Sequence, residues 1–259
     1  MKGLYDRAAF RKALVLVVLI AAWELYARHL DNPLTLPTFS ATARALVDAA
    51  VSGDLIRAAG YTLRLLLRGY LLGLVFAAIL TAFATLSRLG ADLLETLTSM
   101  FNPLPSIALL PLALIWFGLG EGSIIFVLIH AVLWAVALNT HAGFQGVSPT
   151  LRMVGQNYGL SKLGYITKIL IPGAFPSILS GLKVGWAFAW RTLIAAELVF
   201  GVSSGSGGLG WYIYENKNML DIPAVFAGLF TVILIGLIVE NLIFRNIESA
   251  TVRRWGMQS

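Results

Sequence analysis

Six long apolar runs dominate the sequence, and they limit the chain to a fold whose solvent is a lipid bilayer. The runs are residues 13–27, 61–86, 97–117, 124–143, 172–200 and 224–244. About 20 apolar residues in a helix cross the hydrocarbon core, and a helix satisfies its own backbone polar groups there. Only 12% of the residues are charged, against about 25% in soluble domains. The sequence therefore predicts an all-α membrane protein with six spans.

The basic residues predict which side of the membrane each connecting segment occupies. Six spans place both termini on one side, and cytoplasmic segments are enriched in Lys and Arg. With both termini inside, eleven of the nineteen Lys and Arg residues lie in cytoplasmic segments, six outside and two within spans. The expected cytoplasmic segments are 1–12, 88–95, 148–171 and 245–259, and the expected periplasmic segments are 29–60 and 201–222. The net charge of +6 is explained in this way without a nucleic-acid partner.

The first apolar run raises a choice between a retained helix and a cleaved signal peptide. Basic residues before residues 13–27 are typical of both. No clean cleavage site follows the run, and Arg28 and His29 come directly after it. We therefore expect a retained first helix, followed outside the membrane by a surface helix over residues 41–59.

Prolines interrupt the third run, which holds Pro103, Pro105 and Pro111. A proline inside a helix removes a hydrogen bond and kinks the helix. In a bilayer the freed carbonyl groups must be satisfied by protein or by a water-filled path. Two interpretations stay open: a kinked helix that lines a substrate path through Pro105 and Pro111, or a helix kinked only for packing.

The segment before the fifth run predicts a small amphipathic elbow in the cytoplasm. Ser148 and Pro149 form a helix-start pair, because a serine caps free N–H groups and a proline at the first position loses nothing. Gly159 can end this helix, and Ser161 can cap the start of the next one. Another protein can push on such an elbow, and the expected coupling residues are Ser148, Leu151, Val154, Tyr158, Gly159, Ser161, Ile169 and Pro172.

Part of the elbow resembles the cytoplasmic "EAA" loop of ABC-importer permeases. Gly159, nine further residues, Ile169 and Pro172 are similar to the pattern G-x9-I-x-L-P, with Ile171 where leucine is usual. The EAA triplet falls on residues 153–155, which read Met-Val-Gly and do not keep it.

Two further motifs extend the resemblance to roughly residues 60–255. The stretch from Asn102 to Glu121 is similar to the third-helix signature of permeases in the nitrate, sulfonate and taurine branch, and so is Ala195 to Leu198 followed by Gly208 to Gly210. The resemblance implies a type I importer bundle with a coupling helix between spans 4 and 5, in the bacterial inner membrane. It also implies a homodimer, two cytoplasmic ATPase subunits that hold ATP and Mg, and a periplasmic solute-binding protein. The expected substrate is a small anion.

The chain itself is expected to hold no cofactor and to be no enzyme. It has no G-x4-G-K-[ST] motif, and the G-x-G-x-x-G match at residues 205–210 lacks the strand and helix that a nucleotide site needs. His130 and His141 are about 16 Å apart on an ideal helix, too far to share a metal ion. There is no cysteine and no pairing of a nucleophile with a base.

Charged residues inside the spans are functional candidates because burying them is costly. Lys183 and Arg191 are eight residues apart, about 80° around a helix, so both could border one cavity and attract an anion. Alternatively, Arg191 pairs with Glu197 or Glu240, and Lys183 extends toward the interface. We interpret Glu197 and Glu240 as structural charges.

Two other classes remain as alternatives. The first is an ion-gradient-driven secondary transporter, which usually shows internal repeats. The second is a membrane-embedded enzyme. The sequence does not name the solute.

Overall fold

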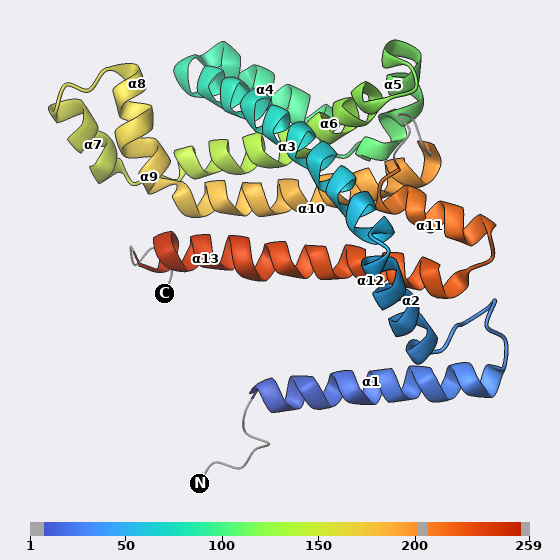
Figure 1. Cartoon of the computed structure of the whole chain (residues 1–259). Helices are drawn as coiled ribbons and strands as arrows, with labels where there is room; N and C mark the ends of the chain where they lie inside the picture. The colour runs from blue at the N-terminus through green and yellow to red at the C-terminus, as the bar shows by residue number, and fades with distance from the viewer. Residues whose placement is uncertain (1–7, 201–206, 255–259) are drawn as a thin grey trace, which may run out of the picture.

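The computed structural model describes residues 8–200 and 207–254, and every regular element in these ranges is helical. Short 3-10 and π turns join several of the helices (Figure 1). The helices are α1 (Ala8–Leu30), α2 (Phe39–Val51), α3 (Asp54–Leu86), α4 (Arg88–Phe101), α5 (Leu110–Phe117), α6 (Glu121–Gln145), α7 (Pro149–Asn157), α8 (Lys162–Tyr165), α9 (Ile171–Gly173), α10 (Phe175–Phe200), α11 (Leu209–Asn218), α12 (Ile222–Ile238) and α13 (Arg245–Glu248).

Helices α3, α6 and α10 form the core of the bundle (Figure 1). Small residues allow this close packing: a Cβ built at Gly69 would lie 2.6 Å from the Cβ of Leu128, and one at Gly73 would lie 2.7 Å from the Cβ of Val132. The G-x-x-x-G pair of α3 therefore serves helix packing within the chain, since only glycine lets α6 approach so closely.

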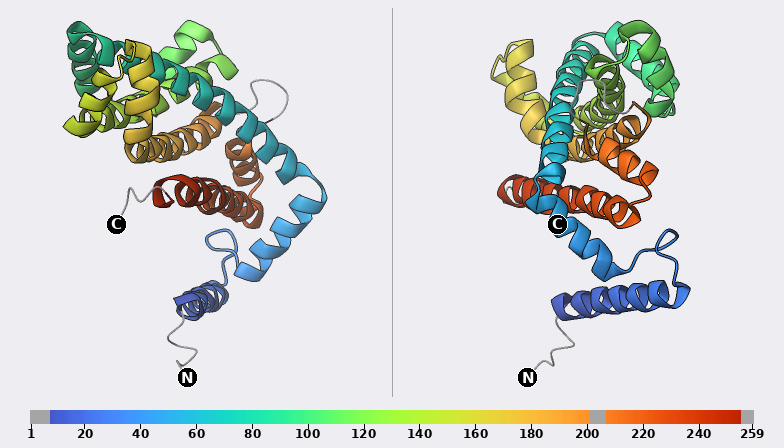
Figure 2. Two further views of the ribbon diagram at one scale, coloured as in Figure 1. Left: turned by 90° about the vertical axis from the view of Figure 1, so that its left-hand side faces the viewer. Right: turned by 45° about the vertical axis from the view of Figure 1, so that its right-hand side comes forward.

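Helix α1 lies at one side of the molecule and is joined to the rest through aromatic contacts (Figure 2). The indole of Trp23 stacks on Phe230 with ring centroids 5.6 Å apart, and its Nε1 donates to the carbonyl oxygen of Pro37 at 2.9 Å. The carboxylate of Glu24 accepts from the backbone N–H of Ser40 at 3.0 Å and pairs with Arg28. The first apolar run thus docks on the chain through its C-terminal end.

The surface helix and the second span differ from their expected bounds. Helix α2 ends at Val51, and α3 begins at Asp54, seven residues before the predicted start of the span. The break falls at Gly53, whose φ of +81° lies in the left-handed region that favours glycine. A helical pattern over residues 41–59 could not reveal this change of direction.

The third run is a broken pair of helices and not one kinked helix. Helix α4 and the segment Ser106–Phe117 meet at 88°, and residues 88–95, expected as a loop, form the first half of α4. Pro103 and Pro105 cause the break, because a proline cannot donate to the helix and disfavours helical conformation in the preceding residue. Pro111 lies in the first turn of α5, where its missing N–H removes no bond.

The last two runs also differ from their expected bounds. Residues Lys162–Gly173 and Phe175–Val199 meet at 77°, so the fifth span proper begins after Pro172. The last helix continues from Ile222 to Arg253, nine residues beyond the predicted end of the sixth span. Within residues 8–200 and 207–254, four helices are long and apolar enough to cross a membrane, and up to six segments are if each bent pair counts as one span.

Some residues of the sequence analysis lie outside the described ranges. They are residues 1–7 and 255–259 of the two terminal segments and residues 201–206. The match to G-x-G-x-x-G is therefore described only from Gly207 onward.

Candidate functional site: a coupling elbow and a membrane cavity

The elbow starts and stops where its local sequence predicts. The hydroxyl of Ser148 accepts from the backbone N–H of Leu151 at 3.4 Å, and Pro149 is the first residue of α7. At the other end Gly159 has a φ of +61°, and the N–H of Leu160 donates to the carbonyl of Gly155 at 3.3 Å. This left-handed glycine cap satisfies a free carbonyl group of the helix.

Ser161 restarts the chain as predicted, since its hydroxyl accepts from the N–H of Gly164 at 3.2 Å and caps α8. A π turn at residues 166–170 follows, and π turns inside helices often accompany functional positions. Ala174 then leaves the helical conformation, with φ −99° and ψ 7°, and the chain bends into α10. The elbow therefore has two short limbs joined at Gly159 (Figure 1).

The two limbs pack closely against each other because Gly155 has no side chain at their contact. A Cβ built at Gly155 would lie 2.8 Å from Cδ2 of Tyr165 and 3.2 Å from Cγ1 of Ile169. Gly155 occupies the third position of the expected triplet, so the departure from the pattern makes room for the tyrosine ring. The elbow is a packed unit because of this contact.

The inner side of the elbow is anchored to the ends of two core helices. A buried apolar cluster joins the C-terminal end of α6 to the start of α10, and its members are Phe144, Val147, Ile166, Leu170 and Ala174. Ile169 packs against this cluster, whereas Pro172 is exposed. The elbow is therefore packed against the ends of α6 and α10.

The outer side of the elbow exposes apolar side chains. Leu151 and Val154 of α7 are exposed, and Tyr158, which directly follows α7, is 80% exposed. Single exposed apolar residues are common on protein surfaces, but a group of them on one short helix is typical of a contact surface.

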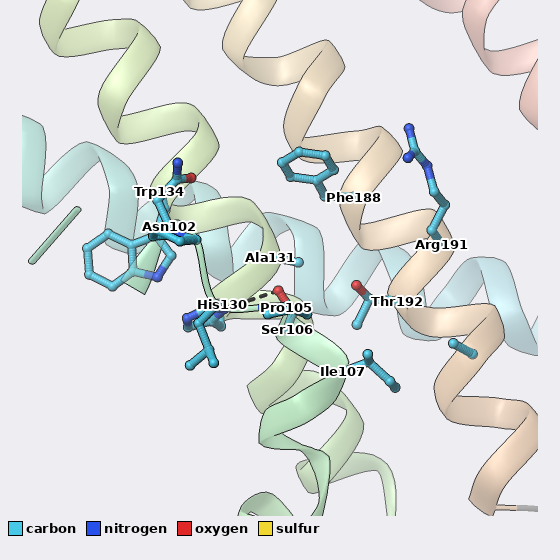
Figure 3. Close-up of a pocket in the computed structure, with 13 residues that line it drawn as sticks. Asn102, Pro105, Ser106, Ile107, His130, Ala131, Trp134, Phe188, Arg191 and Thr192 are labelled. Atoms are coloured by element: carbon cyan, nitrogen blue, oxygen red, sulfur yellow. Dashed lines mark hydrogen bonds between the residues drawn. The ribbon is translucent and has the colours of Figure 1, made fainter. Parts of the chain in front are cut away.

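A cavity of about 370 Å³ lies beside the broken third span (Figure 3). Its wall is built from the break between α4 and α5, from α6 and from α10. The lining residues are Asn102, Pro103, Leu104, Pro105, Ser106, Ile107, His130, Ala131, Trp134, Phe188, Arg191, Thr192 and Ala195. Pro105 lines this cavity, and Pro111 does not.

Arg191 lines the cavity, and the described part of the chain offers it no carboxylate within ion-pair distance. Its guanidinium lies over the ring of Phe188, 5.9 Å from the centroid. The alternative pairing with Glu197 or Glu240 is not present, because Glu197 bonds elsewhere and Glu240 is exposed. Arg191 thus stays a candidate for anion contact.

Lys183 does not border this cavity, so the interpretation that it shares one cavity with Arg191 is wrong. Its Nζ lies 2.7 Å from Oε2 of Glu248, and both residues are partly buried. Glu248 also pairs with Arg253 at 3.3 Å. The last helix reaches Lys183 because it continues past Phe244, and Val252 packs on Leu179 one turn away. The expected end of the sixth span concealed this partner.

Glu197 is a structural hydrogen-bonding residue, without an ion pair among the described residues. Its carboxylate accepts from the hydroxyl of Thr62 at 2.9 Å and from the backbone N–H of Gly210 at 2.9 Å. The hydroxyl of Thr62 accepts from the N–H of Leu209 at 2.8 Å. Both residues therefore cap the first turn of α11, and a Cβ at Gly210 would lie 2.5 Å from the Cβ of Glu197. The two motifs Ala195–Leu198 and Gly208–Gly210 are parts of one contact.

Sequence reasoning missed several residues of the two sites. Thr62 carried no local signal, since its partner Glu197 is 135 residues away. Trp134, Ser106 and Thr192 are ordinary residues of apolar runs, and only the fold gathers them at the cavity. Among the described residues, no three His, Asp or Glu side chains gather closely enough to hold a metal ion.

The described residues form a bundle of membrane-length helices with a packed elbow before α10. Residues 69–251 match the family described as binding-protein-dependent transport system inner membrane component. The chain therefore belongs to this family, in the branch of ABC-importer permeases that includes taurine, sulfonate and nitrate proteins.

Individual relatives agree with this assignment. A putative ABC transporter permease protein of Methanocaldococcus jannaschii is 32% identical over 86% of this chain and 84% of its own length. The taurine transport system permease protein of Escherichia coli is 30% identical over 86% of this chain and 82% of its own length. The nitrate import permease protein of Synechocystis is 32% identical over 61% of this chain and 56% of its own length.

Proposed function

We propose that this chain is the permease subunit of an ATP-driven importer that moves a small anionic solute across the bacterial inner membrane. Two copies of the chain form the path, with both termini in the cytoplasm. A solute-binding protein delivers the solute from the periplasm, and two cytoplasmic ATPase subunits bind and hydrolyse ATP with Mg. The names of the taurine and nitrate relatives support an anionic solute.

The elbow is the observation that carries this proposal. Its outer face exposes Leu151, Val154 and Tyr158 for a partner, and its inner face is packed on the ends of α6 and α10. Closure of the ATPase pair pushes this face, and the rigid contact at Gly155 passes the motion into α10. The two permease copies then alternate between inward-open and outward-open states.

Replacement of Gly159 by proline tests the elbow. Proline requires a φ near −65°, whereas Gly159 has +61°, so the cap cannot form. The chain is co-expressed with the ATPase encoded beside it, and recovery of the complex and its ATPase activity are measured. Gly53→Pro is the matched control, because Gly53 also has a positive φ but lies between α2 and α3, away from the elbow.

We expect wild type and Gly53→Pro to recover an active complex, and Gly159→Pro to lose the complex or its coupling. If wild type recovers no ATPase in several detergents, and uptake needs no ATPase, the importer proposal is wrong. In that case an ion-gradient-driven transporter explains the fold better.

Arg191→Gln should lower uptake of an anion, because it removes the one cation among the lining residues of the cavity.

A further inference from the structure

We propose that an apolar groove and a polar pocket between α3, α6 and the elbow together form a site for one anionic phospholipid. The groove takes an acyl chain, and the pocket takes the phosphate headgroup. This inference rests on the proposed function, because the orientation proposed there places the elbow and the pocket at the cytoplasmic face of the membrane. The groove, the pocket and the elbow residues that line both carry it.

The groove is apolar and is lined by small side chains on one wall. Its volume is about 380 Å³, and α3, α6, α10 and the elbow supply its walls. Ala77, Ala78 and Ala82 line it from α3, and Thr81 and Thr140 are the only polar residues in its lining. Ala78 is exposed, so the groove opens on the surface of a helix that is long and apolar enough to cross a membrane. Acyl chains of the bilayer have access to such an opening.

The pocket has a volume of about 410 Å³ and is polar. It lies where α3 passes into α4, beside the end of α6 and the elbow (Figure 1). Its polar lining residues are Thr85, Ser87, Arg88, His141, Gln145 and Tyr165. Organic ligands occupy hollows of about 300–1,000 Å³, so both the groove and the pocket are large enough to hold part of a ligand.

The groove and the pocket are neighbours. Phe144 lines both of them. On α6, Thr140 lines the groove and the next residue, His141, lines the pocket. In the elbow, Tyr165 lines the pocket and the next residue, Ile166, lines the groove. The combined site therefore changes from apolar to polar along its length, which is the pattern of an amphiphile with its tail in the membrane and its head at the surface.

Arg88 gives the pocket a positive charge. It is exposed, and the described part of the chain places no carboxylate within ion-pair distance of it. Asp92 and Glu95 follow on α4, but neither lines the pocket, and no lining residue is acidic. Basic pockets between membrane helices on the cytoplasmic side bind the headgroups of anionic lipids, and a guanidinium pairs well with a phosphate. The headgroup is therefore expected to carry a net negative charge.

The elbow contributes walls to both parts of the site. Tyr165 and Leu170 line the pocket, and Ile166 and Ile171 line the groove. These residues belong to the π turn at residues 166–170 or flank it directly. A bound phospholipid thus contacts the elbow and the core helices α3 and α6 at once, and it favours the arrangement in which these walls lie together. Lipid composition then affects how the elbow responds to the ATPase.

Lipid binding to the purified full-length chain tests the inference without the ATPase. The chain is delipidated in a mild detergent, and native mass spectrometry measures the affinity for the first lipid bound. The ligands are phosphatidylglycerol, phosphatidylcholine with the same acyl chains, and glycerol 3-phosphate. We expect phosphatidylglycerol to bind about fivefold more tightly than phosphatidylcholine, which is the effect of one basic residue near an anionic headgroup. Glycerol 3-phosphate, which has no acyl chain, should not bind.

Two variants separate the headgroup from the acyl chain. Arg88→Gln should remove the preference for phosphatidylglycerol, and Arg245→Gln is its matched control, because Arg245 is exposed in an expected cytoplasmic segment and lines neither part of the site. Ala78→Phe should fill the groove and weaken both lipids at least tenfold. Ile79→Phe is the matched control, because Ile79 is exposed on the same helix and does not line the groove.

A second variant covers the possibility that Ala78→Phe does not fold. Ile171→Gln places a polar side chain on the opposite wall of the groove, where Ile171 is exposed, and should weaken both lipids at least threefold.

The outcomes distinguish this inference from the proposed function. Equal affinity for the two lipids, or lipid binding by Ala78→Phe and Ile171→Gln that equals wild type, would overturn the site while uptake that depends on the ATPase stands. Wild type that retains no lipid and separates into single chains on Ala78→Phe substitution would assign the groove to a second copy and also overturn the site. Failure of the chain to associate with the ATPase would overturn the proposed function whatever lipid it binds.

Discussion

Replacement of Glu197 by leucine should loosen α11 from the bundle and lower the free energy of unfolding. The carboxylate is 2% exposed and accepts hydrogen bonds from Thr62 and from the backbone of Gly210. Leucine fills a similar space but accepts nothing, so two donors remain buried without a partner. The change therefore isolates the hydrogen bonds from the packing.

The magnitude follows from those two donors. A buried donor without a partner costs about 1–3 kcal/mol, which gives about 2–6 kcal/mol for the O–H of Thr62 and the N–H of Gly210. Hydrogen bonds between membrane helices contribute only about 0.6 kcal/mol each on average, so the loss of two ordinary bonds would cost about 1 kcal/mol. A loss of 2 kcal/mol or more thus means that the carboxylate holds α11 in place.

Thermal unfolding of the purified protein in one detergent measures this loss. For a chain of this size about 1 kcal/mol lowers Tm by roughly 2–4 °C, so we expect a decrease of at least 4 °C. Glu240→Leu is the matched control, because Glu240 is also a glutamate of a predicted span but is exposed. It should leave Tm nearly unchanged.

A double-mutant cycle decides whether the two residues act together. Thr62→Val removes the donor to Glu197 and also the acceptor of the N–H of Leu209. Both changes break the hydrogen bond between Thr62 and Glu197. The sum of the two single losses in free energy of unfolding should therefore exceed the loss measured for the double variant. The reasoning is refuted if Glu197→Leu and Glu240→Leu behave alike, or if the effects of Glu197→Leu and Thr62→Val are simply additive.

Three further outcomes follow from the structure. Gly155→Ala should lower the ATPase activity of the complex, because the added Cβ would lie 2.8 Å from the ring of Tyr165. The loss of activity should be smaller in a Tyr165→Ala background, which removes that ring. Lys183→Met should lower Tm, because Glu248 then keeps only its longer contact with Arg253 at 3.3 Å. The exchanged pair Lys183→Glu with Glu248→Lys should recover part of the lost Tm. Tyr158→Asp should leave Tm unchanged, because the ring is 80% exposed, but should abolish capture of the ATPase in a pull-down; normal capture would remove the outer face from the partner surface.

Features that depend on neighbouring residues could be predicted from the sequence. The class of fold follows from the apolar runs, because lipid leaves the backbone only a helix or a closed barrel. The elbow follows from Ser148, Gly159 and Ser161, because capping and left-handed turns are satisfied within a few residues.

Boundaries were predicted less well where the apolar pattern continues through a change of direction. Residues 97–117 read as one span, yet the prolines divide them into two elements at 88°. Residues 245–253 read as a tail, yet they continue the helix and bring Glu248 to Lys183. Hydropathy reports the solvent of a segment and not its direction, so neither feature could be read from it.

By itself the sequence determined a helical membrane protein with a capped elbow before the fifth span, since composition and local capping suffice for both. Only the tertiary structure decided the roles of the charged residues in the spans. In the folded chain Lys183 pairs with Glu248, and Arg191 lines the cavity. Glu197 accepts hydrogen bonds from Thr62 and Gly210. The physical reason is that the free energy of a buried charge depends on its partners, and here those partners are brought close only by the packing of helices that are distant in the chain.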